Sequence, residues 1–258
     1  MRRIAFAAAL LVAARLRAHD FRIEPSTFHP AAGQVVSIGL RVGQDFLSDP
    51  VPRNGAMIER YFVREGNRVA DVDGSDGADP SGFIVAGGTL PDIIAYASKP
   101  SPTELPAAKF EAYLRQYGLD SIIAERARRG ERGKSGREIF SRCAKSILTG
   151  ARPSLAVTQP LGLRYEIVPS TDPTHDPGPF RGRVVYERTP RAGALVVAVS
   201  QDDPSVRLAT HTARDGSFSF ALPRGGVWLI KSVLMIDAPR GSGAEWESVW
   251  ASLTFERR

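Results

Sequence analysis

His19 is the residue with the clearest chemical potential in this sequence of 258 residues. If the chain were cleaved after Ala18, His19 would offer a free α-amino group and an imidazole, two nitrogen ligands suited to Cu(II) or Ni(II). Asp20 could add a carboxylate, and His211, on an expected strand, could add a second imidazole. The sequence therefore suggests a metal site at His19, Asp20 and His211. The alternative is a frayed terminus that binds nothing.

The first eighteen residues have the order of a secretory signal peptide. Arg2 and Arg3 precede an apolar run at 4–14, and small residues follow it. The run is shorter than the roughly 20 apolar residues that cross a bilayer. We expect cleavage after Ala18, with a competing site after Ala14. The mature chain would then be periplasmic or secreted, without a transmembrane segment.

Positive charge is concentrated in one part of the chain. The formal charge is +6, but the four arginines in 1–18 account for most of it, so nucleic-acid binding is not expected. Residues 109–152 hold eleven basic and five acidic side chains. Within them, Arg126, Arg128 and Arg129 are candidates for contact with another envelope protein, an acidic polymer or anionic lipid. The alternative is a solvated helix face.

The sequence contains no complete catalytic motif. Cys143 is the only cysteine, and its spacing from Phe140, Ala144 and Ile147 predicts a buried, inert thiol on a helix. A reactive or intermolecular thiol is the alternative. The run RRGERGKSG lacks the first glycine of a phosphate-binding loop, because Arg128 stands in its place. An enzyme, for example one that acts on carbohydrate, is the least supported class.

Four aspartates in one loop begin like a calcium-binding loop. They are Asp71, Asp73, Asp76 and Asp79. Gly82 occupies the place of the acid that would complete such a loop. We therefore expect a polar turn, with calcium binding as the alternative.

Short strand patterns separated by turn residues predict a mainly β protein built from two antiparallel sandwiches. The first would span 19–105. Helical spacing of apolar residues predicts two or three helices in an insertion at 106–150, before a proline-rich connector at 151–179. Six further strand patterns, with an Asp-Gly hairpin at 215–216, predict a second sandwich at 180–258.

Several stretches carry a resemblance to known families. RVVYERTPRAGALVVAV and TARDGSFSFALPRGGVWLIK resemble the transthyretin-like, carboxypeptidase-regulatory-like sandwich, which implies a fold but no particular function. AHDFRIEPSTFHPAAGQ, ELPAAKFEAYLRQYGLDSIIAERARRGE, GREIFSRCAKSIL and EWESVWASLTFE make the mature chain similar to a bacterial periplasmic family of unknown function. Members are often labelled nickel-transport-complex, NikM-like proteins. They often carry a histidine where this chain has Leu234, which weakens a metal site that uses this position.

These patterns lead to two expectations about function. The first is a non-enzymatic periplasmic binding protein that handles Ni, Co or Cu through His19, with Cu(II) or Ni(II) as the bound ion. The alternative is an interaction module that contacts another envelope protein or a polymer without metal.

Overall fold

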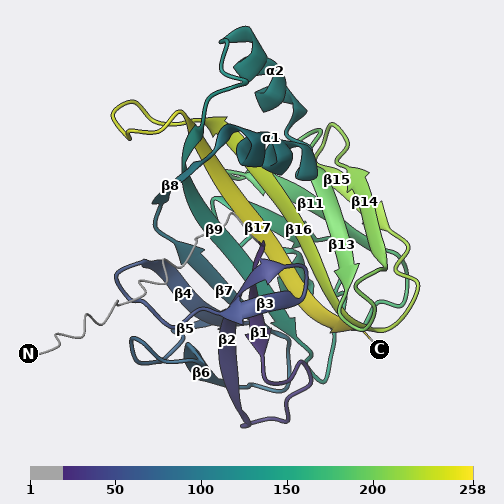
Figure 1. Cartoon of the computed structure of the whole chain (residues 1–258). Coiled ribbons are helices and arrows are strands. Elements are labelled where there is room, and N and C mark those ends of the chain that lie inside the picture. Colours follow the sequence, from purple (N-terminus) through teal and green to yellow (C-terminus); the bar gives the residue numbers. More distant parts are fainter. Residues whose placement is uncertain (1–19, 258) are drawn as a thin grey trace, which may run out of the picture.

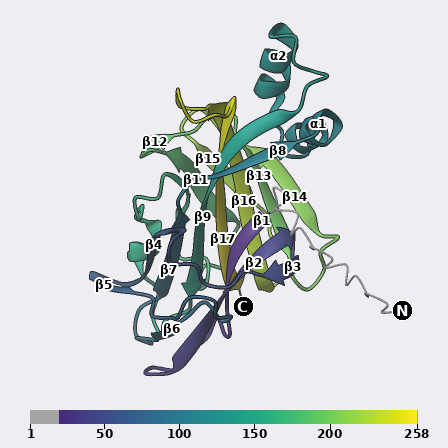
Figure 2. The ribbon, with the colours of Figure 1, turned by 60° about the vertical axis from the view of Figure 1, so that its left-hand side comes forward.

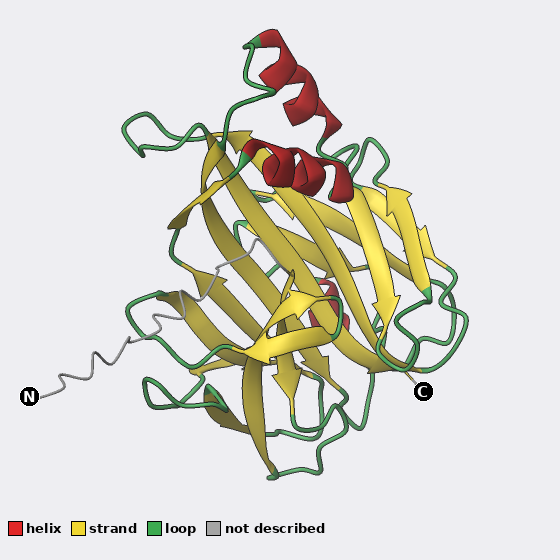
Figure 3. Ribbon diagram, viewed as in Figure 1, coloured by secondary structure: helices red, strands yellow, loops and turns green. Residues whose placement is uncertain are grey.

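The structure is a computed structural model that describes residues 20–257. These residues form three β-sheets, two α-helices and one short 3₁₀ helix (Leu155–Thr158), so the chain is mainly β, as predicted (Figure 3). His19 and the predicted signal peptide at 1–18 lie outside the described residues.

The largest sheet has nine strands and forms the middle layer of the molecule (Figure 1). Only β17 and β9 run parallel, and all other neighbouring pairs are antiparallel. In spatial order the main path contains β14 (Arg207–His211), β13 (Leu195–Ser200), β16 (Gly226–Asp237), β17 (Trp246–Arg257), β9 (Gly136–Leu148), β7 (Asp92–Ser98), β4 (Ile58–Glu65) and β5 (Arg68–Asp71). Strand β8 (Ser101–Leu105) pairs with β9 beside this path.

Two four-stranded sheets cover the opposite faces of the large sheet (Figures 1 and 2). The N-terminal sheet contains β1 (Asp20–Pro25), β2 (Val35–Gln44), β3 (Leu47–Pro50) and β6 (Gly82–Val85). The other, here the rear sheet, contains β10 (Tyr165–Pro169), β11 (Phe180–Tyr186), β12 (Thr189–Pro190) and β15 (Ser217–Phe220).

Alternation along β9 shows how both faces of the middle layer are buried. Cys143 and Ile147 belong to the core shared with the rear sheet, whereas Ala144 and Leu148 belong to the core shared with the N-terminal sheet. Successive side chains of a strand point to opposite faces, so a strand between two layers must be apolar on both.

Both helices lie at one end of the large sheet, on the same face as the N-terminal sheet (Figures 1 and 2). Helix α1 (Ala107–Gln116) buries Phe110, Tyr113 and Leu114 against Trp250 and other residues of the sheet. Helix α2 (Asp120–Arg128) follows after a short turn. No helix within residues 20–257 has the length and apolar character needed to span a membrane.

The prediction of helix over the second half of 106–150 is wrong, because Gly136–Leu148 is strand β9. Phe140 and Ala144 face one side of the large sheet, while Cys143 and Ile147 face the other. Burial on both faces produces apolar residues at spacings of three and four, which resemble a helical period. Cys143 is nevertheless buried, as expected, and burial raises the pKa of its thiol to about 11.

Two further local predictions differ from the structure. The predicted connector at 151–179 contains β10, which pairs along β11 in the rear sheet. The Asp215–Gly216 turn joins β14 to β15, but these strands belong to different sheets and form no hairpin. Strands from both predicted sandwiches also share the large sheet, because β9 stands between β7 and β17.

A buried ion pair ties the middle layer to the rear sheet. Lys145 on β9 places its Nζ atom 2.8 Å from Oε1 of Glu166 on β10, and their side chains are 2 % and 1 % exposed. Glu166 also accepts backbone N–H bonds from Leu161, Gly162 and Leu163 at 2.8, 3.1 and 3.2 Å. Charges removed from water are tolerated only when such partners surround them.

Replacing Lys145 by methionine should therefore lower the free energy of unfolding by about 3–5 kcal/mol, because Glu166 would remain buried without a cation. Urea denaturation of the parent and the variant measures this change. The matched control is Arg137→Met, which breaks an exposed pair with Glu245 and should cost less than about 1 kcal/mol. Equal losses for the two variants would contradict this account.

Candidate functional site

Asp20, a predicted metal ligand, begins β1 and is buried in an ion network. Its carboxylate pairs with Nζ of Lys231, and it accepts hydrogen bonds from the Tyr117 hydroxyl at 3.2 Å and the Asp45 backbone N–H at 3.0 Å. Asp45 Oδ1 lies 2.6 Å from Lys231 and 2.8 Å from Nη1 of Arg207. Two acids are thus matched by two cations, and a metal ion would have to displace Lys231 to use Asp20.

His211 is exposed at the end of β14, which is an edge strand of the large sheet. Strand β13 separates it from β16, the strand that carries Lys231, so the two strands are about 10 Å apart. Within residues 20–257 no three His, Cys, Asp or Glu side chains are grouped closely enough to hold a metal ion. The structure therefore does not gather Asp20 and His211 into one ligand set.

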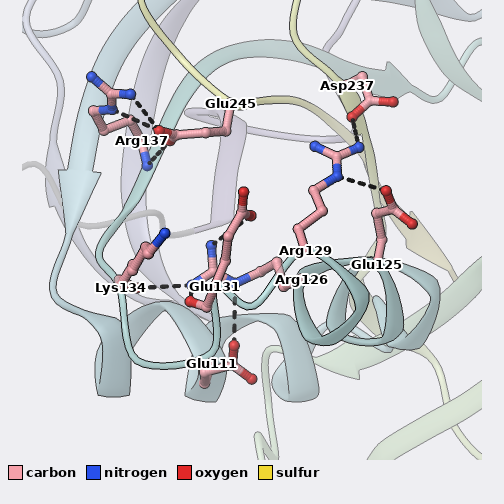
Figure 4. Close-up of polar contacts among 9 residues, drawn as sticks. All are labelled: Glu111, Glu125, Arg126, Arg129, Glu131, Lys134, Arg137, Asp237 and Glu245. Carbon is pink, nitrogen blue, oxygen red and sulfur yellow. Dashed lines mark hydrogen bonds and ion pairs between the residues drawn. The ribbon is translucent and has the colours of Figure 1, made fainter.

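Arg126 was predicted to contact a partner, and this prediction is wrong because its side chain is only 1 % exposed. Figure 4 shows it between the helices and the loop that follows them. Its Nε atom lies 3.2 Å from Glu111 of α1, and Nη2 donates to the carbonyls of Glu131 and Lys134 at 2.8 Å. Its guanidinium also lies 4.8 Å from the Phe110 ring centre. Arg126 fixes the two helices to each other.

Arg128 and Arg129, the other two predicted contact residues, share one acidic partner. Glu125 lies 2.5 Å from Arg128 and 2.6 Å from Arg129, and Arg129 also reaches Asp237 at 2.7 Å. Hydrogen bonds from Arg128 and Arg129 lower the pKa of Glu125 to about 2. These contacts offset part of the positive charge predicted for the helices. Contact of Arg128 and Arg129 with a partner stays a prediction.

The structure reveals an acidic cleft that the sequence did not indicate. It has a volume of about 260 Å³ and lies between the N-terminal sheet and the outermost strands β4 and β5 of the large sheet. Four acids line it, with one arginine. Its lining residues are Val35, Val63, Glu65, Arg68, Ala70, Asp71, Asp73, Phe83, Ile84, Val85 and Asp92.

Asp92 is the buried acid of the acidic cleft. It is 4 % exposed, and its carboxylate accepts the Gly87 backbone N–H at 3.1 Å. Burial raises the pKa of Asp92 to about 6. The negative charge of Glu65 adds to this rise, and the hydrogen bond from Gly87 opposes it. The Glu65 carboxyl group packs directly against Gly87, since a Cβ atom there would lie 2.0 Å from it and would make the Glu65 side chain shift.

Three exposed apolar side chains border the acidic cleft. Val35 and Val85 are directly paired across β2 and β6, and Phe83 lies two residues along β6 on the same face. They are 61 %, 67 % and 46 % exposed. Grouped apolar side chains of this kind on a polar surface are typical of interaction sites.

The aspartate loop divides between the acidic cleft and structural contacts. Asp71 and Asp73 line the cleft. Asp76 accepts the Gly55 backbone N–H at 2.7 Å, and Asp79 pairs with Arg41 at 2.8 Å. The sequence grouped the four aspartates in one loop. It could not show that Asp71 and Asp73 line a cleft with Glu65 and Asp92, because those two acids lie on other strands.

Comparisons with known proteins match the chain to one family. The family model described as "Domain of unknown function (DUF4198)" covers residues 16–235. No curated protein matches the sequence. A solved structure described as the D0-D1 domain of Intimin matches over 92 % of this chain and 97 % of that chain, with 9 % sequence identity and a TM-score of 0.20. Such a low score gives no basis for transferring structure or function. The NikM-like label and the transthyretin-like sandwich stay predictions.

Proposed function

The chain belongs to the DUF4198 family, a domain of unknown function, and we propose that it is a non-enzymatic binding module of the cell envelope. Its site is the acidic cleft, and its partner is an extended protein segment that carries basic and apolar side chains. The signal-peptide pattern at 1–18 supports export. The binding role itself is supported by the charge of the acidic cleft, by the exposed apolar side chains that border it, and by the edge strand β5 beside it.

The unbalanced charge of the acidic cleft is the observation that carries this proposal. Glu65, Asp71, Asp73 and Asp92 face a single cation, Arg68, and none of the five forms an ion pair within the described chain. Asp20, the acid that the sequence predicted as a metal ligand, differs from these four because it pairs with Lys231. A basic partner would offset the excess negative charge.

Strand β5 gives such a partner a backbone to pair with. It is the last strand on the main path of the large sheet, and all four of its residues are exposed. Alternate N–H and C=O groups of an edge strand point away from its neighbour and can bind an added strand. An extended segment beside β5 would place every second side chain over the acidic cleft.

A ten-residue peptide of alternating valine and lysine should therefore bind, and its glutamate counterpart should not. Isothermal titration of both peptides measures the difference, and added salt should weaken binding. The double variant Asp71→Asn with Asp73→Asn should lower the affinity about tenfold, at roughly 0.5–1 kcal/mol for each charge. Asp49→Asn, an exposed acid on β3, is the control and should change nothing. Equal binding of both peptides would refute the proposal.

The exposed apolar residues allow a second arm of the same test. Val35→Ser with Val85→Ser should weaken lysine-peptide binding and leave the free energy of unfolding within about 0.5 kcal/mol. Leu47→Ser is the matched control, because Leu47 is 83 % exposed on β3 and does not line the acidic cleft. An equal effect of Leu47→Ser would count against a local site.

Lysine-peptide affinity should rise as the pH increases from 5 to 7. Asp92, which faces Glu65 and Arg68, has a pKa of about 6 and is mostly protonated at pH 5. If the cation binds only the carboxylate form, the affinity gains up to about tenfold over this range. Titration of Asp92→Asn over the same pH range provides the check, since that variant should show a flat profile. A parent protein with constant affinity would contradict the assigned role of Asp92.

A metal-handling role at His19 is the second candidate. It is favoured by the signal-peptide pattern at 1–18, since cleavage after Ala18 would give His19 a free α-amino group beside its imidazole. A mature chain that begins at His19 should bind Ni(II) or Cu(II) in a calorimetric titration, and His19→Ala should lose this binding. His211→Ala and His175→Ala serve as controls and should bind the metal as the parent does. Unchanged binding by His19→Ala would exclude this site.

A further inference from the structure

A second cavity, here the polar pocket, lies between the large sheet and the rear sheet. Its volume is about 360 Å³, which is enough for a small metabolite. It is lined mainly by charged and small polar residues. They are Glu59, Arg60, Ala97, Ser98, Pro100, Ser141, Cys143, Gly162, Leu163, Arg164, Glu187 and Arg188. None of them belongs to the acidic cleft.

Two cations of the polar pocket converge at Gly162. A Cβ atom on Gly162 would lie 3.8 Å from Nη1 of Arg60 and 3.9 Å from Nη2 of Arg188. Neither arginine forms an ion pair with a residue of the described chain. Both guanidinium groups therefore lie on the same side of the polar pocket, near Gly162, and an anion that entered there would meet two cations.

A β-bulge turns an acid toward the same pocket. The pairing of β4 with β7 shifts register between Ile58 and Arg60, and Glu59 is the extra residue. Neighbouring side chains of a regular strand face opposite sides, but here both Glu59 and Arg60 line the polar pocket. Glu59 has no cation partner within the described chain. The pocket therefore presents one carboxylate and two guanidinium groups that form no ion pair within the described chain. The Nη1 atom of Arg60 is already bonded to two backbone carbonyls.

The tip that carries Arg188 has an unusual backbone. Glu187 and Arg188 connect β11 to β12 with φ angles of 48° and 67°, in the left-handed region that favours glycine or asparagine. Glu187 is held by Arg164, whose Nε atom lies 3.2 Å from its carboxylate. A two-residue hairpin turn requires positive φ angles at both positions, and this turn places Arg188 at the polar pocket.

A buried hydroxyl group completes the lining of the polar pocket. Ser141 is 6 % exposed, and its Oγ atom has no hydrogen-bond partner among the described residues. An unpaired buried hydroxyl lowers stability, so a ligand that bonds it would remove that penalty. Cys143 forms part of the floor, and its raised thiol pKa leaves it neutral near pH 7.

We propose that the polar pocket binds a small zwitterion of amino-acid size. Its carboxylate lies between Arg60 and Arg188, and its ammonium group pairs with Glu59. The Ser141 hydroxyl donates to the ligand carboxylate. Arg60 is already oriented, because Nη1 bonds the carbonyls of Leu161 and Gly162 at 3.2 Å. Little ordering is therefore needed when the ligand enters.

Calorimetric titration of the full chain with the twenty common amino acids tests this proposal. At least one should bind, and the same molecule without its amine should bind about tenfold more weakly. Arg188→Gln and Glu59→Gln should each lower the affinity by tenfold or more. Arg183→Gln, an exposed arginine on β11 in the same sheet, is the control and should bind as the parent does.

Ser141→Ala separates ligand binding from a structural effect. Removal of an unpaired buried hydroxyl should leave the melting temperature unchanged or raise it, while the affinity for the amino acid falls. The proposal is overturned if no amino acid binds. It is also overturned if Arg188→Gln and Glu59→Gln both bind like the parent, or if Ser141→Ala lowers stability without changing affinity.

Discussion

The rear half of the molecule depends on the buried pair between Lys145 and Glu166. Lys145 lies on β9, the strand at the centre of the large sheet, and Glu166 lies on β10 of the rear sheet. Because Glu166 also binds three successive N–H groups, it fixes the loop at 161–163. That loop in turn holds Arg60 through two carbonyl groups. This buried pair therefore joins two layers of the molecule and positions one wall of the polar pocket.

Balanced and unbalanced charges separate structural clusters from candidate sites. Two buried acids that join elements of the fold each have a cation: Lys231 pairs with Asp20, and Arg126 pairs with Glu111. Such buried pairs hold elements in register and have no charge left for a ligand. The acidic cleft and the polar pocket are the opposite case, since they contain acids or arginines that form no ion pair within the described chain. A protein retains such arrangements at a cost in stability, so they mark the surfaces where a partner supplies the missing charge.

The sequence predicted the fold class and α1 because those signals are local. The spacing of Phe110, Tyr113 and Leu114 fits a helix with one buried face, and the structure has that helix. Strand β9 was misread, because burial on both faces removes the alternation that identifies a strand. The acidic cleft combines side chains from five strands and a loop between 35 and 92. No spacing rule links them, and only the pairing of the strands could place Glu65 beside Asp92.

The central claim is that a partner adds a strand at β5. Hydrogen–deuterium exchange tests this claim most directly. The exchange rates of the Arg68–Asp71 amides would be compared with and without the basic peptide. Our account predicts slower exchange at the outward-pointing amides of β5, with no change in α2 near Arg128. Slower exchange at α2, with β5 unchanged, would contradict it and assign the contact to the helices.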